Sequence, residues 1–402
     1  MTDHFIKEGK APEDPALLSR LSVGIPFLSD FLKEQYLMEY IPQGGSKIKF
    51  VTGRPGSGKT HFAHLMHCAA SELNYLTVRL SANTIWLHDF REIYLSVLGQ
   101  CDIETILQGC ARTVISEMGY HADDIPAGQT FIDYLSGKGE ADAISKSAIR
   151  NALRDMFIKN PMLDNGFAYC CSLLTGGILG YPLLEPQNKD LLLSHLAGDK
   201  TVKLGQLRAL GLSPSRVTKY NARHLLRSLS ETVHLGGYAG IFITIDDMEK
   251  LLCRSSSEFI HYSKLRREDT YESLRQLIDE IDGMRYILFM LCFDRELIDN
   301  ESYGIKSYQA LWMRIQNEVV STRFNRFADI LDLDRFADET YTKDVIIEMS
   351  EKLSAYLQTQ GESAKPLTEA EASQLFIKSQ FGGLGLPYLV NRAVICGGSD
   401  NG

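Results

Sequence analysis

One stretch of this 402-residue chain decides its fold: Ile48-Lys49-Phe50-Val51-Thr52-Gly53-Arg54-Pro55-Gly56-Ser57-Gly58-Lys59-Thr60. A β-rich apolar run leads into Gly-x4-Gly-Lys-Thr, and a helix is predicted to follow over 60–73. In that setting glycines let the backbone wrap a polyphosphate, while successive N–H groups and a helix N-terminus supply positive potential. Lys59 would reach the β- and γ-phosphates, and the Thr60 hydroxyl would ligate Mg²⁺. The stretch therefore predicts a site for ATP and Mg²⁺.

The loop and its flanking residues form the predicted nucleotide-binding set: Gly53, Arg54, Pro55, Gly56, Ser57, Gly58, Lys59, Thr60 and His61. An ordinary glycine-rich turn is the alternative interpretation, and it is rare between a strand and a helix.

A second strand carries the acidic half of the site. The run 241–245 is continuous, apolar and largely β-branched, which is typical of a central strand buried on both faces. It ends in Asp246-Asp247, and a phosphate loop needs an acidic partner at the end of a neighbouring strand. Asp246 would hold the Mg²⁺ together with Thr60, and Asp247 would orient the attacking water.

Composition excludes several classes of protein. Charged residues make up 23% of the chain and the hydrophobic set 44%, as in a soluble protein of two or three domains. The net charge of −9 excludes a uniformly basic, nucleic-acid-coating surface. There is no run of about 18 apolar residues, and Met1-Thr2-Asp3-His4 does not begin a signal peptide, so we expect a cytoplasmic chain without a membrane partner. The eight cysteines lack metal-ligand spacing, which indicates reduced thiols.

Strands alternate with helices along the chain. Strands are predicted at 48–51, 74–81, 239–245, 285–293 and 327–333. Helices are predicted at 27–40, 60–73, 85–118 with a break near Gly99, 265–281, 308–320, 341–359, 368–379 and 384–396. This order predicts an α/β fold with a parallel sheet and a C-terminal helical subdomain.

The predicted organisation has three parts. Residues 1–45 form an N-terminal arm and entry helix, of which 1–19 would be mobile or peripheral. Residues 46–325 form the ATPase core, with a helical insert at about 119–235. Residues 326–402 form a last strand and a helical lid.

An ordered series of short motifs extends over nearly the whole chain. It consists of Arg20-Leu21-Ser22-Val23-Gly24-Ile25-Pro26, Lys49-Phe50-Val51-Thr52-Gly53, Leu196-Ala197-Gly198-Asp199, Leu207-Arg208-Ala209-Leu210-Gly211, Asn221-Ala222-Arg223-His224-Leu225-Leu226-Arg227-Ser228-Leu229, Gly237-Tyr238-Ala239-Gly240, Leu274-Arg275-Gln276-Leu277-Ile278-Asp279 and Tyr308-Gln309-Ala310-Leu311-Trp312-Met313-Arg314. With these motifs the chain resembles the AAA+-like ATP-binding proteins of BREX phage-defence systems. The resemblance implies a P-loop NTPase of the AAA+ type that works in a multi-protein antiviral assembly.

The catalytic base departs from the pattern that this resemblance implies. AAA+ ATPases mostly place Glu where Asp247 stands, and the shorter side chain would fall roughly 1 Å short of the same position. Either Asp247 is the base and hydrolysis is slow, or Glu249 supplies the base. If the strand continued past Asp246, Asp247 and Glu249 would share one face.

The resemblance also implies an oligomer in which an arginine of one subunit reaches the γ-phosphate of the next. Ser321-Thr322-Arg323-Phe324 is similar to the Ser-Arg-Phe of origin-recognition and helicase-loader ATPases, so Arg323 is the candidate, with Arg326 second. An arginine paired on a solvated helix end is the alternative.

The lid should carry a second sensing arginine in a Gly-x-Pro-Arg motif. This chain has Gly385-Leu386-Pro387-Tyr388 there, and Arg392 one helical turn later would replace the missing arginine. The polar sensor expected near the end of the 285–293 strand is also atypical, because Cys292 and Asp294 flank Phe293.

Two groups of basic residues are candidates for a contact with DNA. Arg216, Lys219, Arg223 and Arg227 would form one stripe on a helix from Pro214, and Lys264, Arg266 and Arg267 form a second cluster. Solvated helix faces are the alternative interpretation of both.

The sequence is compatible with three functions. The first is an ATP-hydrolysing motor or loader that acts on DNA or on a helicase partner. The second is a nucleotide-gated scaffold or switch with slow hydrolysis, which Asp247 and Tyr388 favour. The third, a small-molecule kinase, is disfavoured by the long insert and the helical lid.

Overall fold

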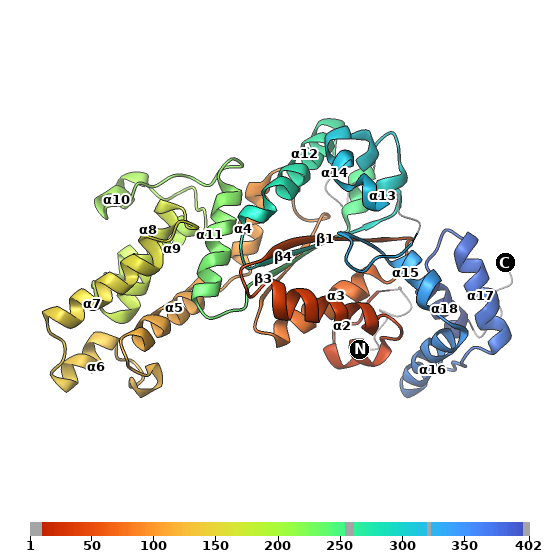
Figure 1. Ribbon diagram of the computed structural model, residues 1–402, viewed down its shortest axis with the longest axis horizontal. Helices are drawn as coiled ribbons and strands as arrows, with labels where there is room; N and C mark the ends of the chain where they lie inside the picture. Colours follow the sequence, from red (N-terminus) through yellow and green to blue (C-terminus); the bar gives the residue numbers. More distant parts are fainter. Residues whose placement is uncertain (1–9, 254–260, 320–322, 397–402) are drawn as a thin grey trace.

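The computed structural model describes residues 10–253, 261–319 and 323–396 and contains one five-stranded parallel sheet (Figure 1). Its strands are β1 (Ser46–Gly53), β2 (Leu76–Ser81), β3 (Ile241–Asp246), β4 (Ile287–Asp294) and β5 (Ile330–Asp332). All five lie where the sequence predicts them, and the predicted parallel α/β fold is confirmed.

The spatial order of the strands is β2-β3-β4-β1-β5. β4 pairs with β1 on one side and with β3 on the other, so the acidic strand is not the direct neighbour of the phosphate-loop strand. The expectation of direct neighbours was wrong because β4 comes later in the sequence and inserts between the two. As a result, the carboxyl ends of β1, β4 and β3 stand in a row, at Gly53, Asp294 and Asp246.

The central strands are buried on both faces, as their apolar sequences predict. Along β4 the side chains of Ile287, Phe289 and Leu291 join one hydrophobic core, and those of Leu288 and Met290 join the other. This alternation divides the molecule into two layers of helices around the sheet.

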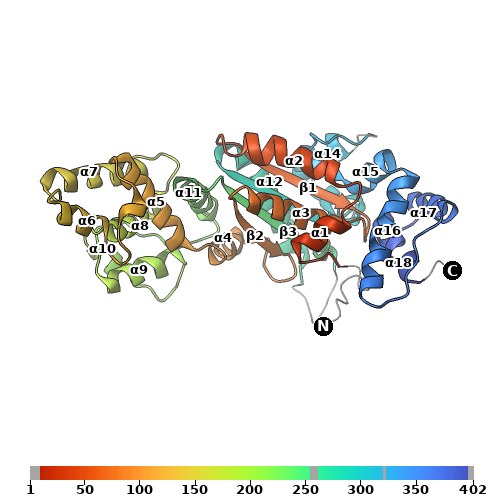
Figure 2. The same ribbon diagram turned by 90° about the horizontal axis from the view of Figure 1, so that it is seen from below.

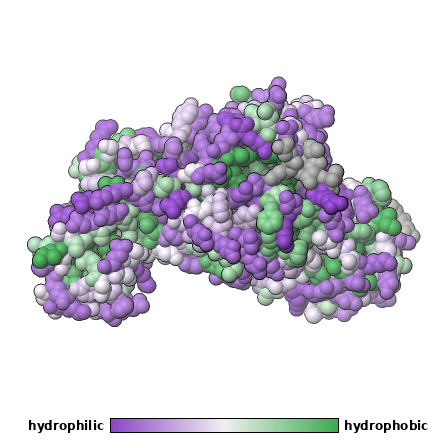
Figure 3. Space-filling view, viewed as in Figure 1, coloured by the Kyte–Doolittle hydropathy of each residue, from purple (hydrophilic) through white to green (hydrophobic). Residues whose placement is uncertain are grey.

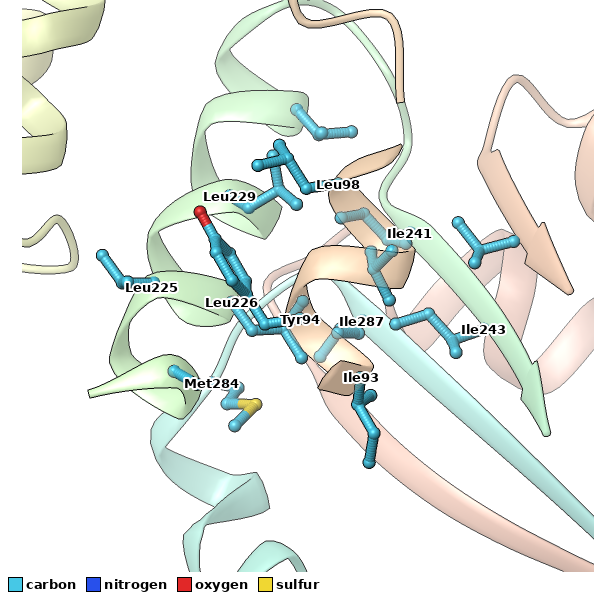
Figure 4. Packing of buried hydrophobic residues seen from close by; sticks show 14 of the residues in the cluster. Ile93, Tyr94, Leu98, Leu225, Leu226, Leu229, Ile241, Ile243, Met284 and Ile287 are labelled. Carbon is cyan, nitrogen blue, oxygen red and sulfur yellow. The ribbon is translucent and has the colours of Figure 1, made fainter. Parts of the chain in front are cut away.

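The first layer contains α4 (Phe90–Gly99), α11 (Ala222–Leu235), α12 (Lys264–Glu280) and α14 (Gln309–Val319). Leu226 and Leu229 of α11 lie on the side of the helix that faces Tyr94 of α4 and Ile241 of β3, whereas Leu225 points away from them within the same hydrophobic core (Figure 4). α11 packs here because it is strongly amphipathic: its leucines recur at helical spacing.

The second layer contains α1 (Pro15–Leu21), α2 (Pro26–Leu32), a π-helix (Lys33–Tyr40) that continues α2, and α3 (Lys59–Glu72). Of the arm predicted to be mobile or peripheral, Pro12 and Glu13 contact α3 and β2. Glu13 pairs with Arg79 at 2.7 Å, and His64 lies 3.2 Å from the carbonyl oxygen of Pro12. Residues 1–9 lie outside the described residues.

A body of helices projects from the β2 side of the sheet (Figures 1 and 2). Its helices are α5 (Ile103–Glu117), α6 (Phe131–Lys138), α7 (Ala143–Leu153), α8 (Asn165–Leu179), α9 (Pro186–Leu196) and α10 (Leu204–Ala209). α5 approaches the end of α11 so closely that a Cβ on Gly109 would lie 2.1 Å from the carbonyl oxygen of Gly236. Only glycine fits this contact, which fixes the body to α11.

The C-terminal helices occupy the opposite end of the molecule (Figure 2). They are α15 (Leu333–Thr340), α16 (Lys343–Thr359), α17 (Glu369–Phe381) and α18 (Leu386–Ile395). The three helices predicted after residue 340 are confirmed. Among the described residues, no helix combines the length and the apolar composition needed to cross a bilayer. The face in Figure 3 is largely hydrophilic, with hydrophobic residues in separate patches.

Candidate nucleotide site

The phosphate loop connects β1 directly to α3. Gly56 and Gly58 have φ angles of 76° and 94°, in the left-handed region where side chains other than glycine are strained. The backbone N–H of Ser57 donates to the carbonyl oxygen of Arg54 at 3.0 Å, which closes the turn. The loop therefore has the backbone form that its glycines predict.

Lys59 is buried at the centre of the site. Its Nζ donates to the carbonyl oxygens of Gly53 and Arg54 at 3.3 and 3.1 Å, and to Oδ1 of Asp294 at 2.7 Å. Sequence reasoning noted Asp294 only as an atypical residue near a sensor position and missed this ion pair. Predicting the ion pair would have required knowing that β4 pairs with β1 in the sheet.

Thr60 and Asp246 meet as the sequence predicts for a metal site. The Thr60 hydroxyl at the start of α3 donates to Oδ2 of Asp246 at 2.8 Å, although β4 separates β3 from the phosphate-loop strand β1. Burial raises the pKa of Asp246, while the backbone N–H of Asp247 and the Thr60 hydroxyl oppose this shift. A hydroxyl and a carboxylate are the oxygen ligands that Mg²⁺ prefers, so this pair would hold the ion.

The loop also fits a polyphosphate. The hydroxyl oxygen of Ser57 is buried and has no hydrogen-bond partner within the described part of the chain. A buried hydroxyl without a partner costs free energy, and a phosphate oxygen is a partner of the right kind.

Asp247 and Glu249 both lie beyond the end of the strand. β3 ends at Asp246, Asp247 has a left-handed φ of 62°, and a 3₁₀ helix (Met248–Leu252) follows. The shared face that a longer strand would give them is therefore absent. The Asp247 carboxylate accepts hydrogen bonds from Ser81 Oγ at 2.6 Å and Asn83 Nδ2 at 2.8 Å.

Glu249 lies among the other acidic groups of the site. Its burial, with the nearby carboxylates of Asp294, Asp247 and Asp246, raises its pKa to about 7. A carboxyl group with a pKa near neutrality is suited to accept a proton at physiological pH. Both candidate bases thus lie near Asp246, a residue that would hold the metal.

A cavity of about 250 Å³ opens beside the loop. Loop residues Gly56 to His61 form one wall, and Leu21, Ser22, Val23 and Ile25 form a second. The third wall belongs to the C-terminal helices and consists of Tyr341, Met349, Leu353, Pro387, Tyr388, Val390 and Asn391. A loop for phosphates next to largely apolar walls is the arrangement that a nucleotide requires.

His61 links two walls of the cavity. Its Nε2 lies 2.7 Å from Oγ of Ser22, and burial lowers its pKa to about 4. The imidazole is therefore neutral at physiological pH.

The C-terminal helices contact the phosphate loop directly. The N–H groups of Gly385 and Tyr388 donate to the carbonyl oxygens of Pro55 and Gly56 at 2.9 and 3.2 Å. A Cβ on Gly385 would lie 2.4 Å from Cα of Ser57, so glycine permits this contact. These helices are therefore held directly against the phosphate loop, as the predicted lid would be.

Arg54 joins the loop to two further helices. Its backbone N–H and its Nε approach Oδ2 of Asp334 at 2.6 and 3.1 Å. Its guanidinium donates to the carbonyl oxygens of Ser379 and Gly382, where α17 ends.

Residues 6–395 match a family model described as BREX system ATP-binding protein BrxC/D. The chain belongs to this BrxC/D family. The resemblance found in the sequence is thus confirmed over nearly the whole chain. No curated protein and no solved structure matches it.

Other residues predicted for the BrxC/D nucleotide site lie outside the cavity wall. Arg392 is exposed on α18, one turn after Tyr388, and it is Tyr388 that lines the cavity. Arg323 is exposed just before β5, and Ser321 and Thr322 of its motif lie outside the described residues. Arg326 lies over the ring of Phe31 at 4.4 Å. The roles of these three arginines stay predictions.

The basic stripe predicted for this BrxC/D chain was wrong in its geometry. α11 begins at Ala222 and not at Pro214, so Arg216 and Lys219 lie in the preceding loop. Arg223 pairs with Glu280 at 2.7 Å, and Arg227 donates to the carbonyl oxygen of Met162 at 3.1 Å. The four residues do not form one helix face.

The second basic cluster is also divided. The Arg267 side chain is buried and donates to the carbonyl oxygen of Leu251 at 3.0 Å, whereas Arg266 stacks over the ring of Trp86. Whether this BrxC/D chain contacts DNA stays a prediction.

Proposed function

We propose that this chain is an AAA+-like ATPase that hydrolyses ATP within a BREX defence assembly, as a motor or loader acting on DNA or a helicase partner. The observation that supports it most is the hydrogen bond from Thr60 to Asp246, next to a cavity whose wall contains Lys59 and Thr60. Two buried or hydrogen-bonded carboxylates, Asp247 and Glu249, stand next to them.

Each residue has a role in this proposal. Backbone N–H groups of Gly56 to Thr60 and the Lys59 ammonium would stabilise charge on the phosphates. Mg²⁺ held by Thr60 and Asp246 would neutralise further charge when bound. Asp247 would orient the attacking water, with Glu249 as the alternative base. Arg323 of a neighbouring subunit would complete the site, which would make the active species a homo-oligomer.

Phosphate release from ATP and Mg²⁺, with and without DNA, tests this proposal. Lys59→Ala and Asp246→Asn should reduce release by at least about a hundredfold, because each removes charge stabilisation of the transition state. Lys33→Ala is the matched control, since Lys33 pairs with Glu72 on the surface. Release by the native protein no faster than by Lys59→Ala would contradict hydrolysis.

A nucleotide-gated scaffold with slow hydrolysis is the second candidate. The Asp247 carboxylate already accepts two hydrogen bonds from Ser81 and Asn83, which restricts its reach toward a water. Tyr388 stands where the resemblance implies a sensing arginine, and its backbone N–H donates to the carbonyl oxygen of Gly56 at 3.2 Å. Sizing the protein with and without ATP and Mg²⁺ tests this function: a change of assembly state with ATP, unaltered in a variant that binds but does not hydrolyse ATP, would favour it.

A further inference from the structure

We propose that His61 selects adenine over bases with a keto group at the 6-position, by accepting a hydrogen bond from the adenine amino group at Nδ1. This inference rests on the proposed function, because it assigns the base selectivity of the same site. It adds a specificity-determining role that the phosphate-loop motif alone does not contain.

The tautomer of His61 follows from two hydrogen bonds. The Ser22 hydroxyl has a single proton, and it lies 2.7 Å from the carbonyl oxygen of Leu18, to which it can only donate. The same Oγ lies 2.7 Å from Nε2 of His61. Since its proton is used on Leu18, Ser22 must accept from His61. Nε2 therefore carries the proton of the neutral imidazole, and Nδ1 is left as an acceptor.

The surroundings keep this arrangement in place. Ser22 is only 7% exposed, so water does not compete for its hydroxyl proton. Leu18 is buried as well, in the helix α1 that packs on α3. At about pH 7.5 even a histidine of ordinary pKa is mostly neutral.

Among the described residues, none competes for Nδ1 of His61. His61 lines the cavity, and within the described part of the chain its ring makes no hydrogen bond other than that with Ser22. Nδ1 is also not among the buried polar atoms that lack a partner, so it remains accessible. An accessible acceptor on the cavity wall can therefore accept a hydrogen bond from a donor of the ligand.

Adenine and hypoxanthine differ at the position that such an acceptor reads. The 6-amino group of adenine donates, whereas the 6-keto oxygen of hypoxanthine or guanine accepts and would face the lone pair of Nδ1. A site that offers an acceptor rejects a second acceptor because the buried lone pairs are then left unpaired. Leu21, Val23 and Met349 are apolar residues of the cavity wall. They would exclude water that could otherwise hydrogen-bond to the keto oxygen.

Equilibrium binding of ATP and inosine triphosphate tests the proposal, because these nucleotides share the ribose and the phosphates. The native protein should bind ATP at least about tenfold more tightly. His61→Leu should reduce this ratio to about one, mainly through weaker ATP binding. Ser22→Ala should reduce it about threefold, because a ring without its fixed partner can present an N–H to the keto oxygen. His64→Leu is the matched control: His64 lies one turn further along α3, outside the cavity wall, and the ratio should persist.

A second measurement reads the tautomer without nucleotide. The ¹⁵N chemical shifts of the imidazole should show a protonated Nε2 in the native protein and a mixed population in Ser22→Ala. An unchanged ratio in His61→Leu with ATP still bound, or a protonated Nδ1 in the native protein, would overturn the inference and leave the proposed ATPase intact. No binding of either nucleotide by the native protein would instead overturn the proposed function.

Discussion

The ammonium group of Lys59 lies 2.7 Å from Oδ1 of Asp294, the last residue of the strand beside it. The same ammonium is the group that a bound triphosphate must reach. Asp294 therefore competes with the nucleotide for Lys59, and it stabilises a buried cation when no nucleotide is present.

Asp294→Asn should separate these two effects. Loss of the carboxylate leaves Lys59 without a charged partner, so the free protein should lose about 1–3 kcal/mol of unfolding free energy. The increase in Tm on addition of ATP and Mg²⁺ should become larger, because the phosphates supply the missing charge. Thermal unfolding with and without ATP measures both effects. Asp299→Asn, which removes a surface partner of Arg295, is the control, and an equal response of the two variants would contradict the role of Asp294.

Gly385→Ala should move the lid away from the phosphate loop. The added Cβ would lie 2.4 Å from Cα of Ser57, so either the lid or the loop must shift. We expect ATP affinity to fall by about tenfold or more, because the lid forms one wall of the cavity. Titration calorimetry measures the loss. Gly383→Ala is the matched control, since a Cβ there meets nothing within 4 Å, and a similar loss in that variant would show that the close contact is not the cause.

The two candidate bases can be separated by hydrolysis rates. Asp247→Asn should lower the rate of ATP hydrolysis by about a hundredfold or more, while ATP binding persists. Glu249→Gln should have a smaller effect if Asp247 is the main base. Steady-state phosphate release and calorimetry check the two quantities. The reverse ranking would assign the base to Glu249, whose pKa of about 7 suits that role.

Leu226→Ala should destabilise the contact between α11 and the sheet. Leu226 is fully buried in the cluster of Figure 4, so its truncation removes apolar burial and leaves a cavity. The expected loss is about 2–5 kcal/mol of unfolding free energy, measured by urea denaturation. Leu265→Ala, at a leucine that is 68% exposed, should change stability by less than about 0.5 kcal/mol. Comparable losses in both variants would argue against the packing of α11 on β3.

The stability of the folded protein should depend on pH through Glu272 of α12. Hydrogen bonds from Arg275 lower the pKa of Glu272 to about 2, from 4.5 for the free side chain. A lowered pKa in the folded state stabilises the protein above pH 4.5, and this stabilisation is lost as the pH falls toward 2. Glu272→Gln should therefore reduce stability at pH 7 by about 0.5 kcal/mol, because solvent screens this exposed pair, and the difference should vanish near pH 2. Unfolding curves across this range check the trend; a difference that grows on acidification would have the wrong sign.

The sequence predicted most of the fold because buried strands and amphipathic helices have distinct apolar spacing. The run from Ile241 to Ile245 could only be a central strand, and Thr60 and Asp246 were correctly expected to meet. The order of the strands in the sheet could not be predicted from apolar spacing. Nothing in the residues 285–293 indicates that this strand inserts between two earlier ones, and so the contact of Lys59 with Asp294 was missed.

The error at Pro214 has a different origin. Basic residues at helical spacing suggested a helix, but that spacing also arises in an irregular segment. Asn221 accepts a hydrogen bond from the N–H of Thr218 at 2.7 Å, a local turn that precedes the helix beginning at Ala222. Apolar anchors at the same spacing, as in Leu225, Leu226 and Leu229, were the better signal.

Arg54 connects the phosphate loop near the start of the chain to the C-terminal helices. It belongs to the loop that receives the phosphates, yet its side chain is bonded to Asp334 at the start of α15 and to the carbonyl oxygens where α17 ends. A ligand that displaces this loop would therefore disturb contacts with residues at least 280 positions away in the sequence. A protein that binds the C-terminal helices would in turn alter the affinity of the loop for its ligand.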